Sequence, residues 1–228
     1  MNYITRQLIQ SSGGSFNYFF QGEYIEGNKW NVPDNRQRQG AWLGDSYDGD
    51  KKIMIYGLGG GVCRGLAGAY LVAGVHWSIF QTYIRSERGR ILVRGVTNFQ
   101  EQLSKIGKTD KLNESFYQIL KTSNVNLVKK HKIARKNIPY SKSVGDEILK
   151  HICSGFLYNI SFDGPWGGHS LGMRIERGDI KLFDPNIGEV TYPYEQGRNQ
   201  AVSHFFDHLC LEYYNPLKSI LIERYASH

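Results

Sequence analysis

Cysteine is scarce in this sequence, since only Cys63, Cys153 and Cys210 occur among 228 residues. An odd and small number of cysteines argues against a disulfide-stapled secreted domain, because such a domain relies on paired cysteines to compensate for a small core. We therefore expect folding in a reducing compartment. Cys153 and Cys210 are expected to be buried free thiols.

Targeting and membrane-spanning segments are also lacking. Residues 1–6 contain no apolar h-region and no small-residue cleavage site, so no Sec signal is expected. Asn2 excludes N-myristoylation of the untrimmed chain. Residues 65–84 carry no formal charge, but they include glycine, histidine, serine, glutamine and threonine. That segment is too polar for a lipid-facing span and is expected to be a buried helix.

The overall composition is that of a globular protein with a substantial core. Hydrophobic residues make up 40% of the chain and charged residues 21%, which excludes wholesale disorder. The length fits one domain with a small appendage. Residues 1–50 are rich in Asn, Gln, Ser and Gly and are expected to be a loosely ordered or appended segment. Residues 51–228 are expected to form the catalytic domain.

Hydrophobic periodicity places most helices before most strands. Apolar residues from Leu66 to Ile84 recur at spacings of three and four, which predicts one helical face. Further helices are expected near 97–106, 113–128, 142–153 and 194–213. Strands are expected at 53–56, 154–162, 169–176, 180–183, 188–192 and 220–225. This order predicts an α+β fold.

A basic stretch interrupts this pattern at residues 121–142, which hold seven Lys or Arg and no acidic residue. We expect the stretch to be helical. It is interpreted either as an ordinary solvated surface or as a surface attracted to an anionic membrane. The net charge of +7 fits an anionic partner, but no nucleic acid is expected. The residues concerned are Lys129, Lys130, Lys132, Arg135 and Lys136.

Three motifs contain residues that could take part in catalysis. Cys63 follows a glycine-rich turn at the start of a predicted helix, where the unpaired N–H groups and the helix dipole stabilise a thiolate. His169 opens one predicted strand and Asp184 ends the next. If those strands form a hairpin near Gly178, both side chains lie at one end of the sheet. A cysteine nucleophile needs such a histidine as acid and base, and a third group to orient the ring.

Each of these residues also has a purely structural interpretation. A lone cysteine on an apolar helix is usually a core residue, and an aspartate before proline commonly starts a turn. A histidine after two glycines can simply lie at a strand edge. Glycines beside both Cys63 and His169 would let a substrate backbone come close, and the combination favours catalysis. The order Cys, His, Asp along the chain is the papain-like order.

The motifs resemble those of the YopT/AvrPphB-type cysteine proteases, which are bacterial effectors with a papain-like fold. The resemblance covers residues 59–189 and is most specific in the Phe-Asp-Pro-Asn-x-Gly-Glu run at 183–189. It implies Cys63 as the nucleophile, His169 as the general base and acid, and Asp184 as the residue that orients His169. The oxyanion donor is expected from backbone N–H groups or Gln39, because Gly57 and Leu58 offer no side-chain donor.

The resemblance also implies a biological setting. The protein would leave a bacterium by a non-Sec route and act on a host protein in the host cytosol, at the inner membrane face. The implied substrate is a membrane-associated small GTPase with a prenylated, polybasic tail. The charge of +7 argues mildly against that substrate, because a basic enzyme repels such a tail unless its cleft is locally acidic.

Two rival functions remain open at this point. The same triad could perform deamidation or acyl transfer on a protein side chain, because the acyl-enzyme step is shared. Alternatively, the chain could be a non-catalytic binding module that uses its basic surface. No cofactor and no metal are expected: His204 and His208 have the i, i+4 spacing of a zinc pair, but aromatic neighbours indicate core packing.

Overall fold

A seven-stranded antiparallel sheet forms the centre of the molecule, with strand order β1-β6-β5-β4-β3-β7-β2. The computed structural model describes residues 1, 3–27, 61–74, 76–105, 109–165, 167–176, 178–193 and 199–227. The strands are β1 (Ser15–Tyr18), β2 (Val125–Ala134), β3 (Leu157–Gly164), β4 (Gly167–Glu176), β5 (Asp179–Asp184), β6 (Gly188–Pro193) and β7 (Ser219–Ser227).

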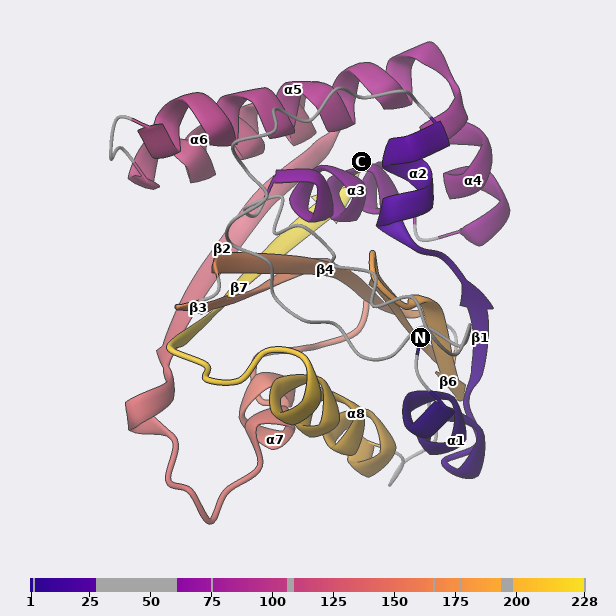
Figure 1. The fold of residues 1–228 in the computed structure, drawn as a ribbon, viewed down its shortest axis with the longest axis vertical. Helices are drawn as coiled ribbons and strands as arrows, with labels where there is room; N and C mark the ends of the chain where they lie inside the picture. The colour runs from indigo at the N-terminus through magenta and orange to yellow at the C-terminus, as the bar shows by residue number, and fades with distance from the viewer. Residues whose placement is uncertain are drawn as a thin grey trace.

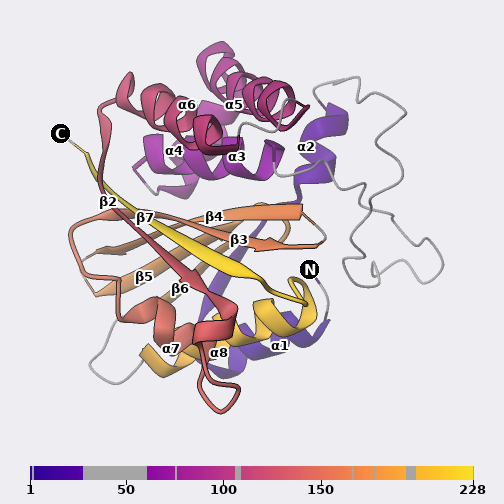
Figure 2. The ribbon, with the colours of Figure 1, turned by 90° about the vertical axis from the view of Figure 1, so that its left-hand side faces the viewer.

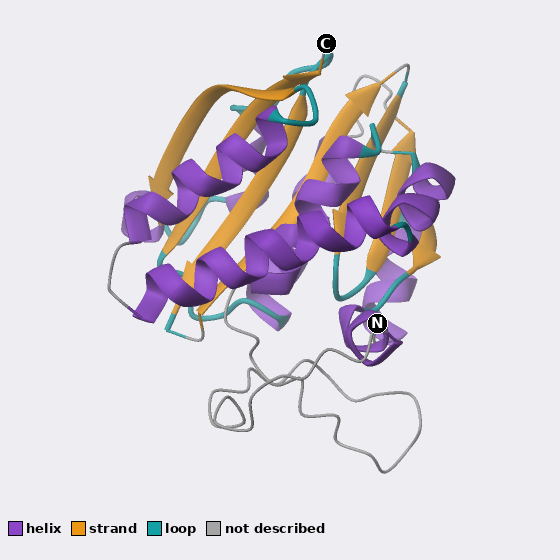
Figure 3. Ribbon diagram, turned by 90° about the horizontal axis from the view of Figure 1, so that it is seen from above, coloured by secondary structure: helices purple, strands orange, loops and turns teal. Residues whose placement is uncertain are grey.

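Helices cover both faces of this sheet (Figures 1 and 2). On one face lie α2 (Gln21–Gly27), α3 (Gly61–Val72), α4 (Trp77–Arg85), α5 (Glu87–Lys105) and α6 (Thr109–Lys121). On the other lie α1 (Tyr3–Ser11), α7 (Val144–Leu149) and α8 (Asn199–Glu212). Seen from above, helices of this group cross over the strands, which remain visible between them (Figure 3). The architecture is α+β, as expected from the sequence.

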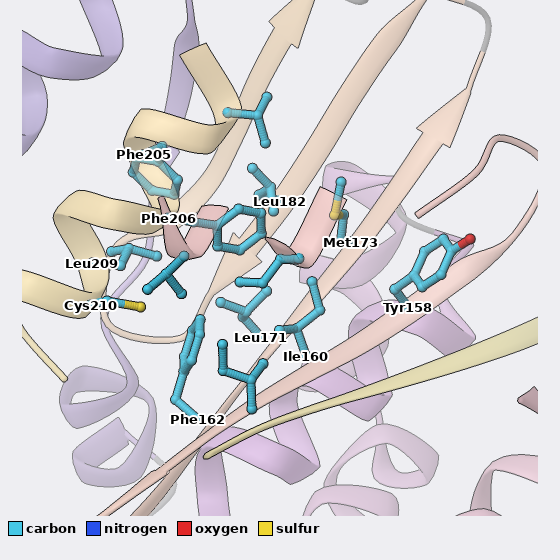
Figure 4. Close-up of a cluster of buried hydrophobic side chains, with 14 of the residues drawn as sticks. Tyr158, Ile160, Phe162, Leu171, Met173, Leu182, Phe205, Phe206, Leu209 and Cys210 are labelled. Carbon is cyan, nitrogen blue, oxygen red and sulfur yellow. The ribbon is translucent and has the colours of Figure 1, made fainter. Parts of the chain in front are cut away.

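Alternation along the strands divides the buried residues into two cores. On β5, Leu182 faces the α7–α8 side, whereas its neighbour Phe183 faces the α3–α6 side. This follows from the two-residue side-chain period of a strand. The first core packs α8 side chains onto β3, β4 and β5 (Figure 4). Its members in that view include Ile160, Phe162, Leu171, Met173, Phe205, Phe206 and Leu209.

Helix α3 is the most deeply buried helix in this arrangement, because α5 covers its outer side and β4 lies beneath it. A side chain at Gly172 would place its Cβ 2.8 Å from the Tyr70 ring. The missing side chain therefore lets α3 lie close to β4. Such close packing fixes the height of the α3 N-terminus above the sheet.

The N-terminal segment differs from expectation. Residues 1–50 were expected to be loosely ordered or appended, but β1 pairs with β6 along the edge of the main sheet, from Ser15 opposite Thr191 to Tyr18 opposite Gly188. Ile9 of α1 is fully buried in the core beneath α8. The prediction was wrong for residues 3–27 because composition does not show a distant pairing partner. The 50/51 boundary and the strand expected at 53–56 lie outside the described residues.

The basic stretch is also not helical. Helix α6 ends at Lys121, Asn124 adopts φ 60°, and β2 then pairs with β7 as an edge strand. A left-handed residue stops a helix, and asparagine tolerates that conformation. Lysines on an exposed edge strand discourage pairing with another chain. The stretch thus becomes a charged sheet edge because β7, about a hundred residues later, supplies the partner strand.

The expected helix over residues 66–84 is divided between α3 and α4, and residues 73–76 lie between them. Among the residues that the structure describes, no helix combines the length and apolar character needed to cross a membrane. Cys210 is buried, as expected, but Cys153 is exposed in the turn before β3, which corrects the expectation of a buried thiol.

A glycine substitution tests how firmly β1 is joined to the sheet. Gly188 has φ +117°, and an added Cβ would lie 2.0 Å from the Asn17 carbonyl oxygen of β1. Gly178 has φ +91° but open space around it. We expect Gly178→Ala to cost about 1–2 kcal/mol from backbone strain, and Gly188→Ala to cost about 3 kcal/mol or more because β1 must move. Urea unfolding monitored by circular dichroism measures both, and equal losses would contradict the tight β1 junction.

Candidate active site

The three residues singled out by the motifs lie on neighbouring elements. Cys63 is the third residue of α3, His169 the third of β4 and Asp184 the last of β5. Strands β4 and β5 form the expected hairpin, with Glu176 opposite Asp179 at its turn. His169 and Asp184 are consequently at the same end of the sheet, where the α3 N-terminus also lies.

A hydrogen bond joins the histidine to the aspartate. His169 Nε2 lies 3.0 Å from Asp184 Oδ1, which leaves Nδ1 as the other ring nitrogen. The Cys63 side chain hydrogen-bonds with the His169 ring. Its Sγ also lies 3.9 Å from the Gly168 carbonyl oxygen. The structure therefore brings thiol, imidazole and carboxylate together in the order expected from the sequence.

All three side chains are nearly buried, with exposed fractions of 3% for Cys63, 5% for His169 and 2% for Asp184. Burial by itself lowers the pKa of His169, but the Asp184 and Cys63 charges and hydrogen bonds outweigh it and raise that pKa to about 10. Burial opposes ionisation of Asp184, yet its contacts with His169, Asn186 and Tyr214 lower the pKa of the carboxyl. The pair is therefore an imidazolium and a carboxylate at neutral pH.

Tyr214 completes the surroundings of this pair. Its hydroxyl donates to Asp184 Oδ2 at 2.7 Å. Its ring stacks on the His169 ring with a centroid distance of 4.7 Å and an interplanar angle of 19°. The same residue thus fixes the aspartate and covers one face of the imidazole. Sequence reasoning missed Tyr214, because a tyrosine that follows a predicted helix carries no catalytic signature.

The loop after β5 holds the aspartate from the other side. The Asn186 N–H donates to Asp184 Oδ1 at 2.8 Å. Asn186 Oδ1 in turn accepts from Gln21 Nε2 at 2.5 Å, and the Gln21 N–H donates to the Pro185 carbonyl oxygen at 2.8 Å. Gln21 was also missed, since it lies in the segment expected to be loosely ordered.

Glu189 is the last residue of the motif at 183–189 and links its own strand β6 to α3 and β1. Its carboxylate accepts from Tyr70 Oη of α3 at 2.5 Å and from Asn17 Nδ2 of β1 at 3.1 Å. Glu189 is 3% exposed, so these two donors satisfy a buried carboxylate. The motif at 183–189 thereby positions Asp184, the edge strand and the nucleophile helix together.

A second buried ion pair anchors α3 directly beside Cys63. Arg64 Nη2 lies 3.0 Å from Glu223 Oε1 of β7, and the fully buried Glu223 also accepts from Tyr117 and Asn159. The Arg64 guanidinium lies 4.3 Å from the centre of the Phe116 ring. Breaking a buried pair by removing one partner costs about 3–5 kcal/mol, so this contact strongly resists displacement of the helix.

The remaining candidates have other surroundings. Gly57, Leu58 and Gln39, considered for the oxyanion hole, lie outside the described residues. His208 Nε2 lies 2.8 Å from Thr5 Oγ1, whereas His204 is exposed. In the part of the chain that the structure describes, no three His, Cys, Asp or Glu side chains gather as metal ligands would.

This arrangement suits nucleophilic catalysis. The first-turn position of Cys63 and the adjacent imidazolium both stabilise a thiolate. The imidazolium can return its proton to a leaving group, while the buried carboxylate keeps the ring in one orientation. A thiol, an imidazole and a carboxylate in this order are the side chains that nucleophilic acyl transfer uses.

A known protein family and a solved structure resemble this chain. The family model Peptidase_C58, described as Yersinia/Haemophilus virulence surface antigen, matches residues 46–222. The crystal structure of the Pseudomonas avirulence protein AvrPphB matches with a TM-score of 0.57 and 17% identity, over 72% of this chain and 91% of that one. This likeness confirms the papain-like fold expected from the sequence. A search of curated proteins found no match.

A second structural match is weaker. The ubiquitin-specific protease of a murine cytomegalovirus tegument protein, solved with a ubiquitin-based suicide substrate, has a TM-score of 0.41 and 11% identity, over 74% of this chain and 79% of that one. The similarity is too low to carry an argument.

The raised pKa of His169 predicts a pH-dependent stability. An unfolded histidine titrates near 6.5, whereas folded His169 titrates at about 10. Between these values the folded ring holds a proton that the unfolded ring has lost. In a Cys63→Ala background, where the thiol adds no titration of its own, stability should therefore fall as pH rises, by about 1 kcal/mol per pH unit. The contribution is complete below 6.5 and lost above 10. Urea unfolding at a series of pH values measures this slope.

Two variants separate this pair from other titrating groups. Asp184→Asn removes the carboxylate that raises the pKa of His169, so we expect most of the slope to disappear. Tyr214→Phe removes only a hydroxyl and keeps the carboxylate, so the slope should persist at lower overall stability. A slope unchanged in Asp184→Asn would contradict the buried pair.

Proposed function

Because this chain belongs to the Peptidase_C58 family of cysteine peptidases, we propose that it cleaves a protein substrate with Cys63 as nucleophile, His169 as general acid and base, and Asp184 as the orienting residue. The observation that supports these roles is the contact of the buried His169 ring with both partners, through Nε2 to Asp184 and through a hydrogen bond to Cys63. The Asp184 carboxylate already accepts hydrogen bonds from His169, from the Asn186 N–H and from the Tyr214 hydroxyl. It therefore does not compete with His169 for the thiol proton.

The reaction follows from this geometry. The Cys63 thiolate attacks the carbonyl carbon of the scissile peptide, and a C–S bond forms while the carbonyl π electrons move to oxygen. When this tetrahedral intermediate collapses, the C–N bond breaks and the His169 imidazolium gives its proton to the departing amine. The neutral imidazole then takes a proton from water. The resulting hydroxide attacks the thioester, which releases the carboxylic acid product and restores the thiolate and the imidazolium.

The family is one of bacterial virulence proteins, which supports a substrate in a host. In this proposal the protein leaves the bacterium by a non-Sec route and cleaves a host protein in the host cytosol. A membrane-associated small GTPase remains the specific candidate. The exposed side chains of Lys129, Lys130, Lys132 and Lys136 support attraction to an anionic inner leaflet. Arg135 contributes less, because its Nη1 donates to the Ile138 carbonyl oxygen at 2.5 Å.

Substitution of the proposed residues tests the activity. We expect Cys63→Ala and His169→Ala to lose proteolysis by about 10⁴-fold or more, since the residues of such a unit depend on one another. Asp184→Asn should retain more activity than either. Peptide N-termini in host lysate treated with wild type and with each variant measure cleavage, and circular dichroism verifies folding.

The same experiment separates proteolysis from its rivals. New N-termini that depend on Cys63 would establish a protease and identify the bond. Proteins changed in mass but uncut would instead indicate a deamidase or acyltransferase. Undiminished cleavage by Cys63→Ala would overturn the assigned nucleophile.

Thiol labelling tests the ion pair independently of any substrate. Near pH 6, iodoacetamide should modify Cys63 faster than the exposed Cys153, although Cys63 is nearly buried, because the imidazolium stabilises its thiolate. Burial raises the pKa of Cys210 to about 12, so that thiol should remain unlabelled. His169→Ala should reduce labelling of Cys63 to or below that of Cys153. Faster labelling of Cys153 in the wild type would contradict an activated Cys63.

A further inference from the structure

A small hollow lies at the β2–β7 edge of the sheet. In the sheet order β7 is two strands from β4, which carries His169, and Figure 2 shows β2 and β7 running side by side. The lining of the hollow consists of Lys129 and His131 from β2, Ile222 and Arg224 from β7, and His151 from the turn after α7. Strand pairing explains the gathering, because Lys129 is opposite Arg224 and His131 is opposite Ile222. The hollow has a volume of about 240 Å³ including its open mouth.

The two histidines and the arginine are held in fixed positions. The His131 and His151 rings are stacked, with centroids 3.9 Å apart and planes 25° from parallel. Arg224 Nη2 donates to the His151 carbonyl oxygen at 3.2 Å, and the guanidinium lies 5.0 Å from the centre of the Phe156 ring. Arg224 Nε is buried and has no hydrogen-bond acceptor among the described residues. A rigid set of donors at one point is the feature that distinguishes a binding site from scattered surface charge.

Positive charge in this hollow is poorly compensated. Lys129 and Arg224 are cationic, and the nearby acid, Glu147, is paired with Lys150 at 2.5 Å. Glu223, the acidic neighbour of Arg224 on β7, is turned to the opposite face and paired with Arg64. Burial, His131 and the neighbouring lysines lower the pKa of His151 despite Glu147. An anion placed here would offset this repulsion.

We propose that this hollow is a binding site for a phosphate monoester group. Such a group carries nearly two negative charges at neutral pH and three terminal oxygens, which match an ammonium, a guanidinium and two imidazoles. The hollow is shallow and open to solvent, so a phosphate group would lie at its mouth with its terminal oxygens toward the lining side chains. The group could belong to a soluble metabolite or to a phosphorylated inositol lipid in a membrane, and both sources share the same recognised chemistry.

Neighbouring lysines of β2 provide a matched test. Lys129 and His131 are on the face of β2 that lines the hollow, whereas Lys130 and Lys132 alternate to the opposite face. We expect Lys129→Ala and His131→Ala to weaken binding of inorganic phosphate at least about tenfold. Lys130→Ala and Lys132→Ala should change it less than about twofold. Isothermal titration calorimetry measures affinity, and the imidazole proton signals of His131 and His151 report the location by NMR.

Vesicles distinguish the two sources of the phosphate. One set contains phosphatidylinositol 4-phosphate and the other phosphatidylserine, at equal surface charge. Preferential binding to the first set, lost in Lys129→Ala and kept in Lys130→Ala, would support the site with a lipid headgroup as its ligand. Saturable binding of free phosphate with no vesicle preference would support the site with a soluble ligand.

Two results would overturn the proposal. One is absence of saturable phosphate binding to the wild-type protein. The other is equal weakening by Lys129→Ala and Lys130→Ala, which is what diffuse electrostatic attraction would produce. Neither result bears on the proposed nucleophile, because the four substituted residues are on β2, away from Cys63 and His169. Cleavage of soluble proteins in host lysate, which needs no membrane attraction, is therefore an independent control.

Discussion

The structure depends on a buried pair of opposite charges, the imidazolium of His169 and the carboxylate of Asp184. Isolated, either ion would be costly in the protein interior. The cost of burying the Asp184 charge is offset because the carboxylate accepts hydrogen bonds from His169, from the Asn186 N–H and from Tyr214. Both of its oxygens are thereby satisfied. The Tyr214 ring stacks on the imidazole and limits its rotation. The orientation needed for proton transfer is therefore a result of satisfying this pair.

Elements far apart in the chain supply those contacts, which explains why the N-terminal segment belongs to the catalytic unit. Gln21 holds Asn186, and Asn186 holds Asp184. Glu189 links β1 to Tyr70 of α3, and Arg64 ties the same helix to Glu223. Cys63 is thereby held from two directions against the sheet end that carries His169. The helix cannot shift without breaking a buried polar contact.

The middle of the sheet and its β2 edge have different chemistry. At β4 and β5, a buried ion pair marks the proposed catalytic site. At the β2 edge, lysines and paired histidines remain near solvent and carry excess positive charge. The same charge keeps the open edge of β2 from pairing with another chain. The lysines can therefore prevent aggregation and bind a ligand at the same time. Because β3 lies between β4 and the β7 strand that lines the hollow, a ligand at one region can bind without occupying the other.

The sequence by itself determined a large part of this protein. Alternating apolar residues predicted β3 to β7 nearly to their observed ends, and the glycine-flanked Cys63 and His169 with Asp184 identified the candidate site. These signals are local, because strand period, helix start and motif spacing are properties of neighbouring residues. Tertiary structure alone decided that 125–134 form a strand rather than a helix, that Ser15–Tyr18 form a sheet edge, and that Tyr214 and Gln21 support Asp184. Those outcomes depend on partners that lie 30 residues away, for Tyr214 and Asp184, to 176 residues away, for Ser15 and Thr191. The local pattern carries no information about which distant segment will pack there.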